Sequence, residues 1–222
     1  FVLGTPHGDG RPVSGTYLRL VDLPDARSKE RTCREIVAVD QHALRIDRTL
    51  ENVGAIPGAP LAYWASEEVL NAFDSGTPVG DIAPTRKGMV TARNDEFLRL
   101  WTEVSAARSS LGVAHTRESA RESGKRWFAY IKGGPARRWY GNYPYVVDWY
   151  DDGRRLQTER HPTENRVWAT NSNLEFIFRP NINWGDISGA GLTARWSDGG
   201  MLFDGKGPAC FPPPDRALEI LA

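Results

Sequence analysis

The sequence predicts an α+β fold built on a twisted, mostly antiparallel sheet with short helices. Three observations predict it. Short segments of alternating apolar and polar residues recur over the last two thirds of the 222 residues, as strands with one buried face require. Turn signals rich in glycine and proline separate these segments. Capped stretches with helical apolar spacing are few and short.

Each predicted strand is a short run whose apolar residues alternate or cluster between turn signals. In chain order these runs are 16–21, 35–39, 44–46, 79–83, 126–130, 146–149, 174–178, 192–196 and 201–203. A glycine turn at 133–134 is expected to join strand 126–130 to a partner that starts at Trp139. A second turn, 198–200, is expected to join the last two runs in a hairpin.

One helix is predicted after Ser66, whose side chain can accept hydrogen bonds from the first helical turn. Glu67 and Glu68 favour the positive end of the helix dipole, and Gly76 is expected to end the helix. The apolar residues expected on its buried side are Val69, Leu70 and Phe73.

The remaining segments predict loops or leave two structures open. Residues 95–104 carry apolar side chains at a spacing that fits either a helical turn or a core strand. Loops or turns are predicted where charged, polar or turn-forming residues dominate, at 1–12, 27–34, 56–60, 85–94, 106–123, 151–153 and 188–191.

Composition limits the possible partners and compartments. Formal net charge is zero, with 28 cationic and 28 acidic residues, so an anionic partner must be bound by a local patch. Cys33 and Cys210 are far apart and no histidine cluster accompanies them, which argues against zinc and fits a reducing cytoplasm. No window approaches the roughly 18 apolar residues of a membrane span. The first residue, Phe1, and the abrupt end after 212–214 indicate a piece of a longer protein.

Residues 125–149 are the most unusual stretch of the chain. They interleave cations with many aromatic residues around a turn at 133–135. Cations neutralise phosphates and aromatic faces stack on bases, so this composition is typical of a nucleic-acid surface. It also fits the core of a hairpin with arginines on its wet face. Composition alone leaves both interpretations open.

Enzyme signatures are scarce. The four histidines are scattered, and no Gly-x-Ser-x-Gly elbow or phosphate-binding P-loop occurs. Residues 142–145 (NYPY) differ by one position from the Asn-Pro-Pro-Tyr-type box of amino-methyltransferases. Tyrosine in place of the first proline changes the backbone of that box. We therefore predict no catalytic residue, metal or cofactor in this chain.

Several ordered motifs point to one family. They are 56–64 (IPGAPLAYW), 80–83 (GDIA), 97–104 (FLRLWTEV), 130–134 (YIKGG), 138–142 (RWYGN), 145–149 (YVVDW), 182–184 (INW) and 203–208 (FDGKGP). Over about residues 50–211 the chain resembles the region downstream of the catalytic domain in large adenine-specific DNA methyltransferases. These are the PglX-type enzymes of BREX phage-defence systems and related type II restriction–modification methylases.

The resemblance implies a target-recognition region akin to the TaqI-type and type I specificity modules. Such a region holds double-stranded DNA while an upstream methyltransferase domain of the same chain, using S-adenosylmethionine, extrudes the adenine. The implied domains are 1–50, with lead-in strands from the preceding domain, 51–211, the target-recognition domain, and 212–222, the start of a following segment. Relatives commonly carry Thr-Gly-Asp-Asn where this chain has 91–94 (TARN), so the DNA contacts of that loop are expected to differ.

A module that holds a duplex needs phosphate contacts for register and base-edge contacts for sequence. Gly133 and Gly134 would allow close backbone approach, and Asn94 or Asn142 would read a base edge. The cations expected to face DNA are Arg86, Lys87, Arg93, Lys125, Arg126, Lys132, Arg137 and Arg138. The last two cannot both face it if they lie on one strand. The tryptophans expected in the core are Trp139, Trp149 and Trp184.

Two functions of other classes are open alternatives. A protein-interaction module would dock partner subunits of the defence complex, and a large exposed apolar patch would favour it. A carbohydrate-binding β-domain would also use tryptophan and tyrosine. It is disfavoured because the aromatic residues lie among arginines rather than among the acids and amides that bind sugars.

Overall fold

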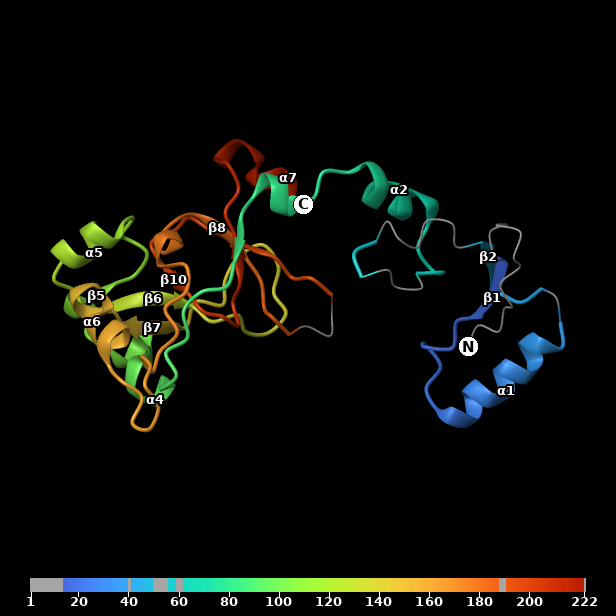
Figure 1. Cartoon of the computed structure of the whole chain (residues 1–222), viewed down its shortest axis with the longest axis horizontal. Helices are drawn as coiled ribbons and strands as arrows, with labels where there is room; N and C mark the ends of the chain where they lie inside the picture. Colours follow the sequence, from blue (N-terminus) through green and yellow to red (C-terminus); the bar gives the residue numbers. More distant parts are fainter. Residues whose placement is uncertain (1–13, 40, 50–55, 59–61, 188–190, 222) are drawn as a thin grey trace. The chain divides into compact units, whose positions relative to one another are not determined.

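The computed structural model describes residues 14–39, 41–49, 56–58, 62–187 and 191–221 (Figure 1). The chain divides into two compact units, residues 1–78 and 79–222. The predicted lead-in at 1–12 and most of the predicted turn at 188–191 lie outside the described residues. The domain boundaries implied by the resemblance remain a prediction.

The first unit pairs strand β1 (Ser14–Leu18) with strand β2 (Arg45–Thr49) in antiparallel register. Helix α1 (Ala26–Val37) connects them, and helix α2 (Glu67–Ser75) follows. The predicted cap of α2 is confirmed, because the Ser66 side chain accepts a hydrogen bond from the Val69 amide. Its predicted buried side is wrong: no residue of α2 is buried, and Val69 and Phe73 are about half exposed.

Helix α1 corrects two predictions, a loop at 27–34 and a strand at 35–39. Asp25 caps the helix by accepting a hydrogen bond from the Ser28 amide at 2.8 Å. Glu30 pairs with Arg34 one turn later at 2.9 Å, a spacing that stabilises helices. Charged residues therefore cover a solvated helix rather than a loop, and Ile36 is the buried residue of the helix.

The second unit contains a mixed sheet with strand order β10-β6-β7-β4, and β5 also pairs with β6 (Figure 1). Neighbours β6–β7 and β7–β4 are antiparallel, whereas β10 and β5 run parallel to β6. The strands are β4 (Leu98–Leu100), β5 (Ser109–Ser110), β6 (Trp127–Ile131), β7 (Tyr145–Asp148) and β10 (Leu202–Phe203).

A smaller sheet of the same unit has the order β3-β11-β8-β9, with antiparallel neighbours throughout. Its strands are β3 (Thr85–Arg86), β8 (Asn181–Asn183), β9 (Arg195–Ser197) and β11 (Ala209–Cys210). Antiparallel pairings dominate the chain, as predicted, and the mixed sheet adds parallel ones. The α+β class is confirmed.

Short helices fill the connections of the second unit. The α-helices are α3 (Val79–Ile82), α4 (Asn94–Phe97), α5 (Arg117–Glu122), α6 (Tyr150–Thr158) and α7 (Ala217–Leu221). The 3-10 turns are η2 (Trp101–Glu103), η3 (Ala106–Arg108), η4 (Leu174–Phe176) and η5 (Pro214–Arg216). Among the described helices none is long and apolar enough to cross a membrane.

The core of the second unit forms around the mixed sheet, where Phe128, Trp149, Phe178 and Phe203 are buried. A smaller cluster lies at the other sheet, around Ile182. Of the tryptophans predicted to be buried, Trp149 is buried and Trp184 is partly buried. The prediction for Trp139 is wrong, because this side chain is 54% exposed.

Several other predicted elements differ from the structure. Residues 79–83 contain helix α3 and residues 174–178 contain turn η4, not strands. Residues 106–123 contain β5 and α5 rather than a mobile loop. Strands β9 and β10 lie in different sheets and form no hairpin, because β9 pairs with the preceding strand β8 and β10 pairs with the distant strand β6. Residues 95–104 contain both open alternatives, a helical turn and a strand.

Candidate nucleic-acid interface

Three lysines and an asparagine line an open depression of about 420 Å³ in the second unit. Lys87 follows β3, Lys132 follows β6, and Lys206 lies in the turn between β10 and β11. Asn94 opens helix α4. Three segments that are distant in the sequence, around residues 87–94, 132 and 204–206, therefore converge on one pocket, which we call the lysine pocket. Three of these residues were predicted to bind DNA, and Lys206 was not.

Asp204 lies at the base of the lysine pocket with 1% of its surface exposed. Its carboxylate accepts hydrogen bonds from the Tyr130 hydroxyl at 2.6 Å, from Lys132 Nζ at 3.1 Å and from the Lys206 amide at 2.6 Å. Burial, and then the charge of Asp204, raise the pKa of the Tyr130 hydroxyl well above its ordinary value. Lys132 is thus a structural counter-ion as well as a lining residue.

The other two lysines stand at the mouth of the pocket. The side chains of Lys87 and Lys206 are 67% and 66% exposed. Both pair with Asp186, at 3.4 Å and 3.0 Å. The hydrogen bond from Lys206, and then the charge of Lys87, lower the pKa of Asp186 below its ordinary value. One carboxylate facing two exposed lysines leaves a local excess of positive charge.

The fold itself requires glycine at position 133. Its φ of +77° is a conformation that L side chains rarely adopt, and a Cβ atom there would lie 2.5 Å from the Lys206 carbonyl oxygen. The turn after β6 therefore packs directly against the turn that carries Lys206. Gly134 also has positive φ, and a Cβ atom there would lie 3.2 Å from the Asn142 side chain. Gly133 thus contacts the turn that carries Lys206, and Gly134 contacts Asn142.

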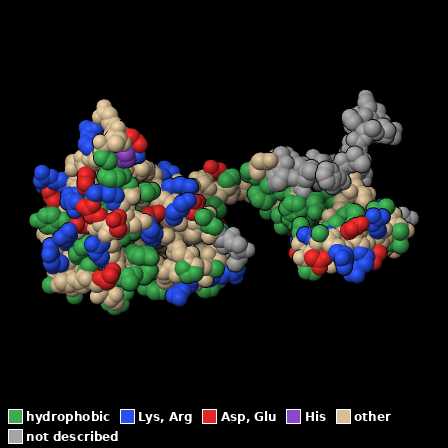
Figure 2. All heavy atoms as spheres, turned by 90° about the horizontal axis from the view of Figure 1, so that it is seen from below, with side chains coloured by type: hydrophobic (Ala, Val, Ile, Leu, Met, Phe, Trp, Pro, Cys, Tyr) green, Lys and Arg blue, Asp and Glu red, His purple; other side chains and the backbone are tan. Residues whose placement is uncertain are grey.

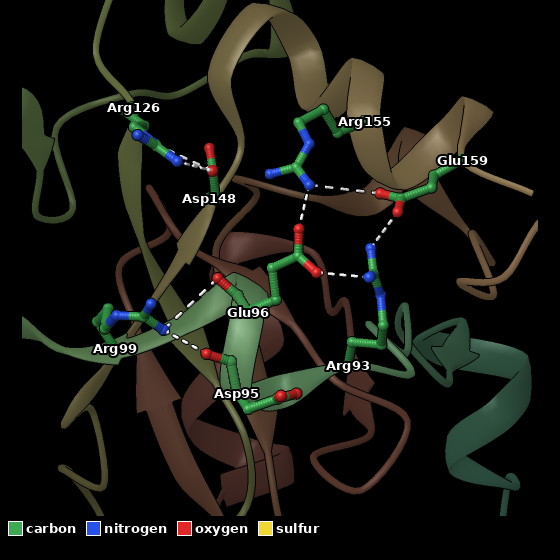
Figure 3. A network of polar contacts seen from close by, with 8 residues as sticks. All are labelled: Arg93, Asp95, Glu96, Arg99, Arg126, Asp148, Arg155 and Glu159. Carbon is green, nitrogen blue, oxygen red and sulfur yellow. Dashed lines mark hydrogen bonds and ion pairs between the residues drawn. The ribbon is translucent and has the colours of Figure 1, made fainter.

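Arg93 lies in a network of ion pairs that ties α4 to α6 (Figure 3). It pairs with Glu96 at 2.6 Å and with Glu159, and its guanidinium lies 4.5 Å from the centre of the Trp168 ring. Its side chain is only 23% exposed. Two carboxylates thus neutralise a cation that the sequence assigned to DNA.

Three further predicted cations contact their own fold. Arg126 pairs with Asp148 at 2.7 Å (Figure 3). Lys125 donates to the Ala107 carbonyl at 2.6 Å. The guanidinium of Arg86 lies 4.9 Å from the centre of the Phe176 ring. Residues 126 and 132 flank strand β6, so they are about 20 Å apart along it. The predicted set therefore does not form one continuous patch.

Residues 135–143, which we call the aromatic segment, follow directly after the glycine turn. Arg137 and Arg138 are exposed and lie outside any strand, so the constraint that one strand would place on them does not apply. Trp139 and Tyr140 are 54% and 65% exposed. Asn142 has a φ of +64° and donates to the Pro135 carbonyl at 2.8 Å. The segment offers exposed cations and aromatic faces, and it begins three residues after Lys132 in the sequence.

Acidic and basic side chains lie intermixed on the face shown in Figure 2, in line with a net charge of zero. Among the described residues no group of three or more His, Cys, Asp or Glu side chains could hold a metal ion.

Sequence reasoning missed two residues of this region. Lys206 belongs to the FDGKGP motif, and its isolation from other cations in the sequence hid its role. Arg195 is fully buried on β9, although an arginine in a run of alternating apolar and polar residues is expected on the solvent-exposed face of the strand. The parallel pairing of β10 with β6, which brings the FDGKGP turn to Lys132, has no local signal.

No family model matches the chain. It is 39% identical over 201 residues to the adenine-specific methyltransferase PglX of Lacticaseibacillus casei (strain Zhang), which covers 89% of this chain and 16% of that protein. It is 32% identical over 174 residues to the adenine-specific methyltransferase BrxX of Escherichia coli O9:H4 (strain HS), with 78% and 13% covered. The chain spans less than a fifth of either relative. Over most of its length the chain is a homologue of one segment of the PglX and BrxX adenine-specific methyltransferases, the BREX-type family that its sequence motifs indicate.

Proposed function

We propose that this chain is a duplex-DNA recognition module of a longer adenine-specific DNA methyltransferase, working in BREX phage defence or restriction–modification. The lysine pocket carries the proposal, because exposed Lys87 and Lys206 stand at its mouth. The aromatic segment adds two exposed arginines and two exposed aromatic rings. Cations that contact phosphates fix register, and amides and aromatic groups near them can contact bases.

The assignment includes the parent protein. A methyltransferase domain of the longer protein would bind S-adenosylmethionine and modify an extruded adenine, while this module holds the flanking duplex in the cytoplasm. We propose a fold relationship to TaqI-type and type I specificity modules on the same grounds. Both relatives are named adenine-specific methyltransferases, which supports a parent protein of that kind.

Binding of a labelled duplex, measured by fluorescence anisotropy over a series of salt concentrations, tests the proposal. Affinity should fall linearly with salt on logarithmic axes, with a slope of about 0.9 per phosphate contact. The double variant Lys87→Ala/Lys206→Ala should bind more weakly, and its slope should be smaller by about two. Lys132 is unsuitable for this test, because its loss also leaves the buried Asp204 without a counter-ion.

Arg216→Ala is the matched control, because Arg216 pairs with Glu219 on η5 and α7, away from the lysine pocket. It should leave DNA binding unchanged. The proposal fails if the unaltered chain shows no duplex binding at low salt. It also fails if the lysine variant and the control bind equally well.

A second function is favoured by the first unit. Trp64, Val69 and Phe73 are 54%, 46% and 49% exposed, and the last two lie one turn apart on α2. Apolar side chains that remain exposed together are typical of protein contacts. We propose that this unit docks the methyltransferase domain of the parent or another defence subunit. Val69→Asp/Phe73→Asp should weaken binding of the chain to the separately purified methyltransferase segment in calorimetry, and unchanged binding would contradict the docking role.

A further inference from the structure

Arg195 is a buried cation whose charge no described residue balances. Its surface is fully buried on strand β9. Nε donates to Asn183 Oδ1 at 3.2 Å, whereas Nη1 and Nη2 have no hydrogen-bond partner among the described residues. Its buried polar neighbours on the same small sheet are neutral, among them Asn181 and Ser197. Two strong donors are therefore held in place without acceptors in the part of the chain that the structure describes.

Such an arrangement is unfavourable for the fold alone. A buried charge without a partner destabilises the folded state, and an apolar side chain of similar volume would serve packing better. Burial lowers the pKa of the Arg195 guanidinium, the nearby Tyr143 opposes this shift, and the charge of Arg137 adds to it. Arginine nevertheless remains protonated in proteins. The unpaired donors indicate a ligand that supplies acceptors.

The aromatic segment pairs with the backbone of strand β9 and is itself strained. Trp139 forms an isolated bridge with Arg195, donating its amide to the Ala194 carbonyl at 2.9 Å and accepting from the Trp196 amide at 2.9 Å. Its φ is +74°, which is an outlier for a bulky residue. Observed backbone strain is concentrated at functional and switching segments of proteins.

Side chains of the aromatic segment add further contacts. The Tyr143 hydroxyl donates to the Trp196 carbonyl at 2.7 Å, and the Tyr140 ring packs edge-on against Tyr143 at 5.4 Å between ring centres. The exposed Arg137 and Arg138 lie on the same segment. A duplex that attracts these two arginines would pull on the segment whose backbone pairs with β9 at Arg195. Release of the positive φ at Trp139 would offset part of the hydrogen bonding lost when the segment lifts.

We propose that Arg195 is a specificity-determining residue that reads a guanine in the major groove after the aromatic segment has shifted. The inference rests on the proposed DNA-binding function and deepens it. Nη1 and Nη2 would donate to the O6 and N7 acceptors of one guanine, a pairing that only this base presents. The bond from Nε to Asn183 holds the guanidinium in a fixed orientation, which suits a paired acceptor better than a mobile phosphate. Exposed Arg137 and Arg138 are placed to contact the phosphates.

Selection from a random-sequence duplex library tests this assignment. The unaltered chain, Arg195→Met, Arg195→Lys and the control Arg216→Met would each be selected and the bound DNA sequenced. The unaltered chain and the control should enrich one motif with an invariant guanine. Arg195→Met should lose the preference at that position alone and bind the motif roughly five- to a hundredfold more weakly. Arg195→Lys, with a single donor group, should retain part of the preference.

Thermal unfolding of the same proteins separates reading from support of the fold. Arg195→Met should melt no lower than the unaltered chain, because it removes an unpaired buried charge. The inference is overturned if the Arg195 variants enrich the same motif as the unaltered chain. Uniform weakening on all sequences with a smaller salt slope would also overturn it, because that pattern marks a phosphate contact. If the unaltered chain enriches no motif and binds no duplex, the proposed function fails as well.

Discussion

Removal of the Lys132 charge should destabilise the second unit through Asp204. Lys132 Nζ lies 3.1 Å from a carboxylate that is almost completely buried. Two unit charges at that distance attract by about 1 kcal/mol at the dielectric constant of water and by about 5 kcal/mol at an effective value of about 20. The Lys132 side chain is a quarter exposed, and Asp204 keeps the Tyr130 hydroxyl and the Lys206 amide as donors. We therefore expect Lys132→Met to lower the free energy of unfolding by about 2 kcal/mol.

A double-mutant cycle with Asp204→Asn isolates this ion pair. Each single substitution leaves one charged group without its partner. The loss of unfolding free energy in the double variant should therefore be smaller than the sum of the two single losses by at least about 1 kcal/mol. Urea unfolding followed by tryptophan fluorescence is a suitable assay, because Trp64 is the one tryptophan outside the second unit. Additive effects, within about 0.5 kcal/mol, would refute the coupling.

Three further outcomes follow from contacts described above. Gly133→Ala should lower the melting temperature more than Gly124→Ala. Both positions have positive φ, but only at 133 would a Cβ atom clash with a backbone atom, the Lys206 carbonyl oxygen at 2.5 Å. Equal losses in melting temperature would contradict the close approach. Arg93→Met should reduce stability by about 1 to 2 kcal/mol in urea unfolding, because it removes the less exposed of the two arginines that pair with Glu96 and Glu159 and leaves both carboxylates to Arg155, whereas Arg216→Met, at an exposed pair, should cost less than about 1 kcal/mol. Asp186 has a lowered pKa in the folded chain, so its contribution to stability is present at neutral pH and lost as the pH falls below about 4; Asp186→Asn should flatten the acid limb of the melting profile, and an unchanged limb would show that the pairing contributes nothing.

Local signals in the sequence predict an element where the local residues decide its structure. Ser66 caps α2 as expected, and strand β7 lies where the apolar run at 146–149 predicts it. Helix α1 was not predicted because most of its residues are polar or charged. Only Ile36 is buried, so little of the helix has to be apolar. The turn at 198–200 has every local mark of a hairpin. Its flanking strands nevertheless pair elsewhere, Ile182 with Trp196 and Tyr130 with Leu202.

The same distinction holds for the candidate site. Lys87, Asn94 and Lys132 were identified as separate polar residues, and the structure brings them to one pocket. That they share it with Lys206 depends on long-range strand pairing, which no spacing encodes. Arg93 has its counter-ions in Glu96 on α4 and in Glu159 directly after α6, and Arg126 has Asp148 on β7. The sequence shows where cations are, whereas the fold determines which of them are already neutralised.

The pairing of β3 with β11 has a consequence for how the second unit is made. Arg86 pairs with Ala209, so about 120 residues must be translated between one partner and the other. At roughly 5 to 20 residues per second, the first strand waits on the order of 6 to 25 s for the last. The small sheet cannot close during that interval, and nascent chains would be vulnerable to proteases and dependent on chaperones until Cys210 has left the ribosome. A stop codon a few residues before this strand would therefore remove far more of the unit than the residues it deletes.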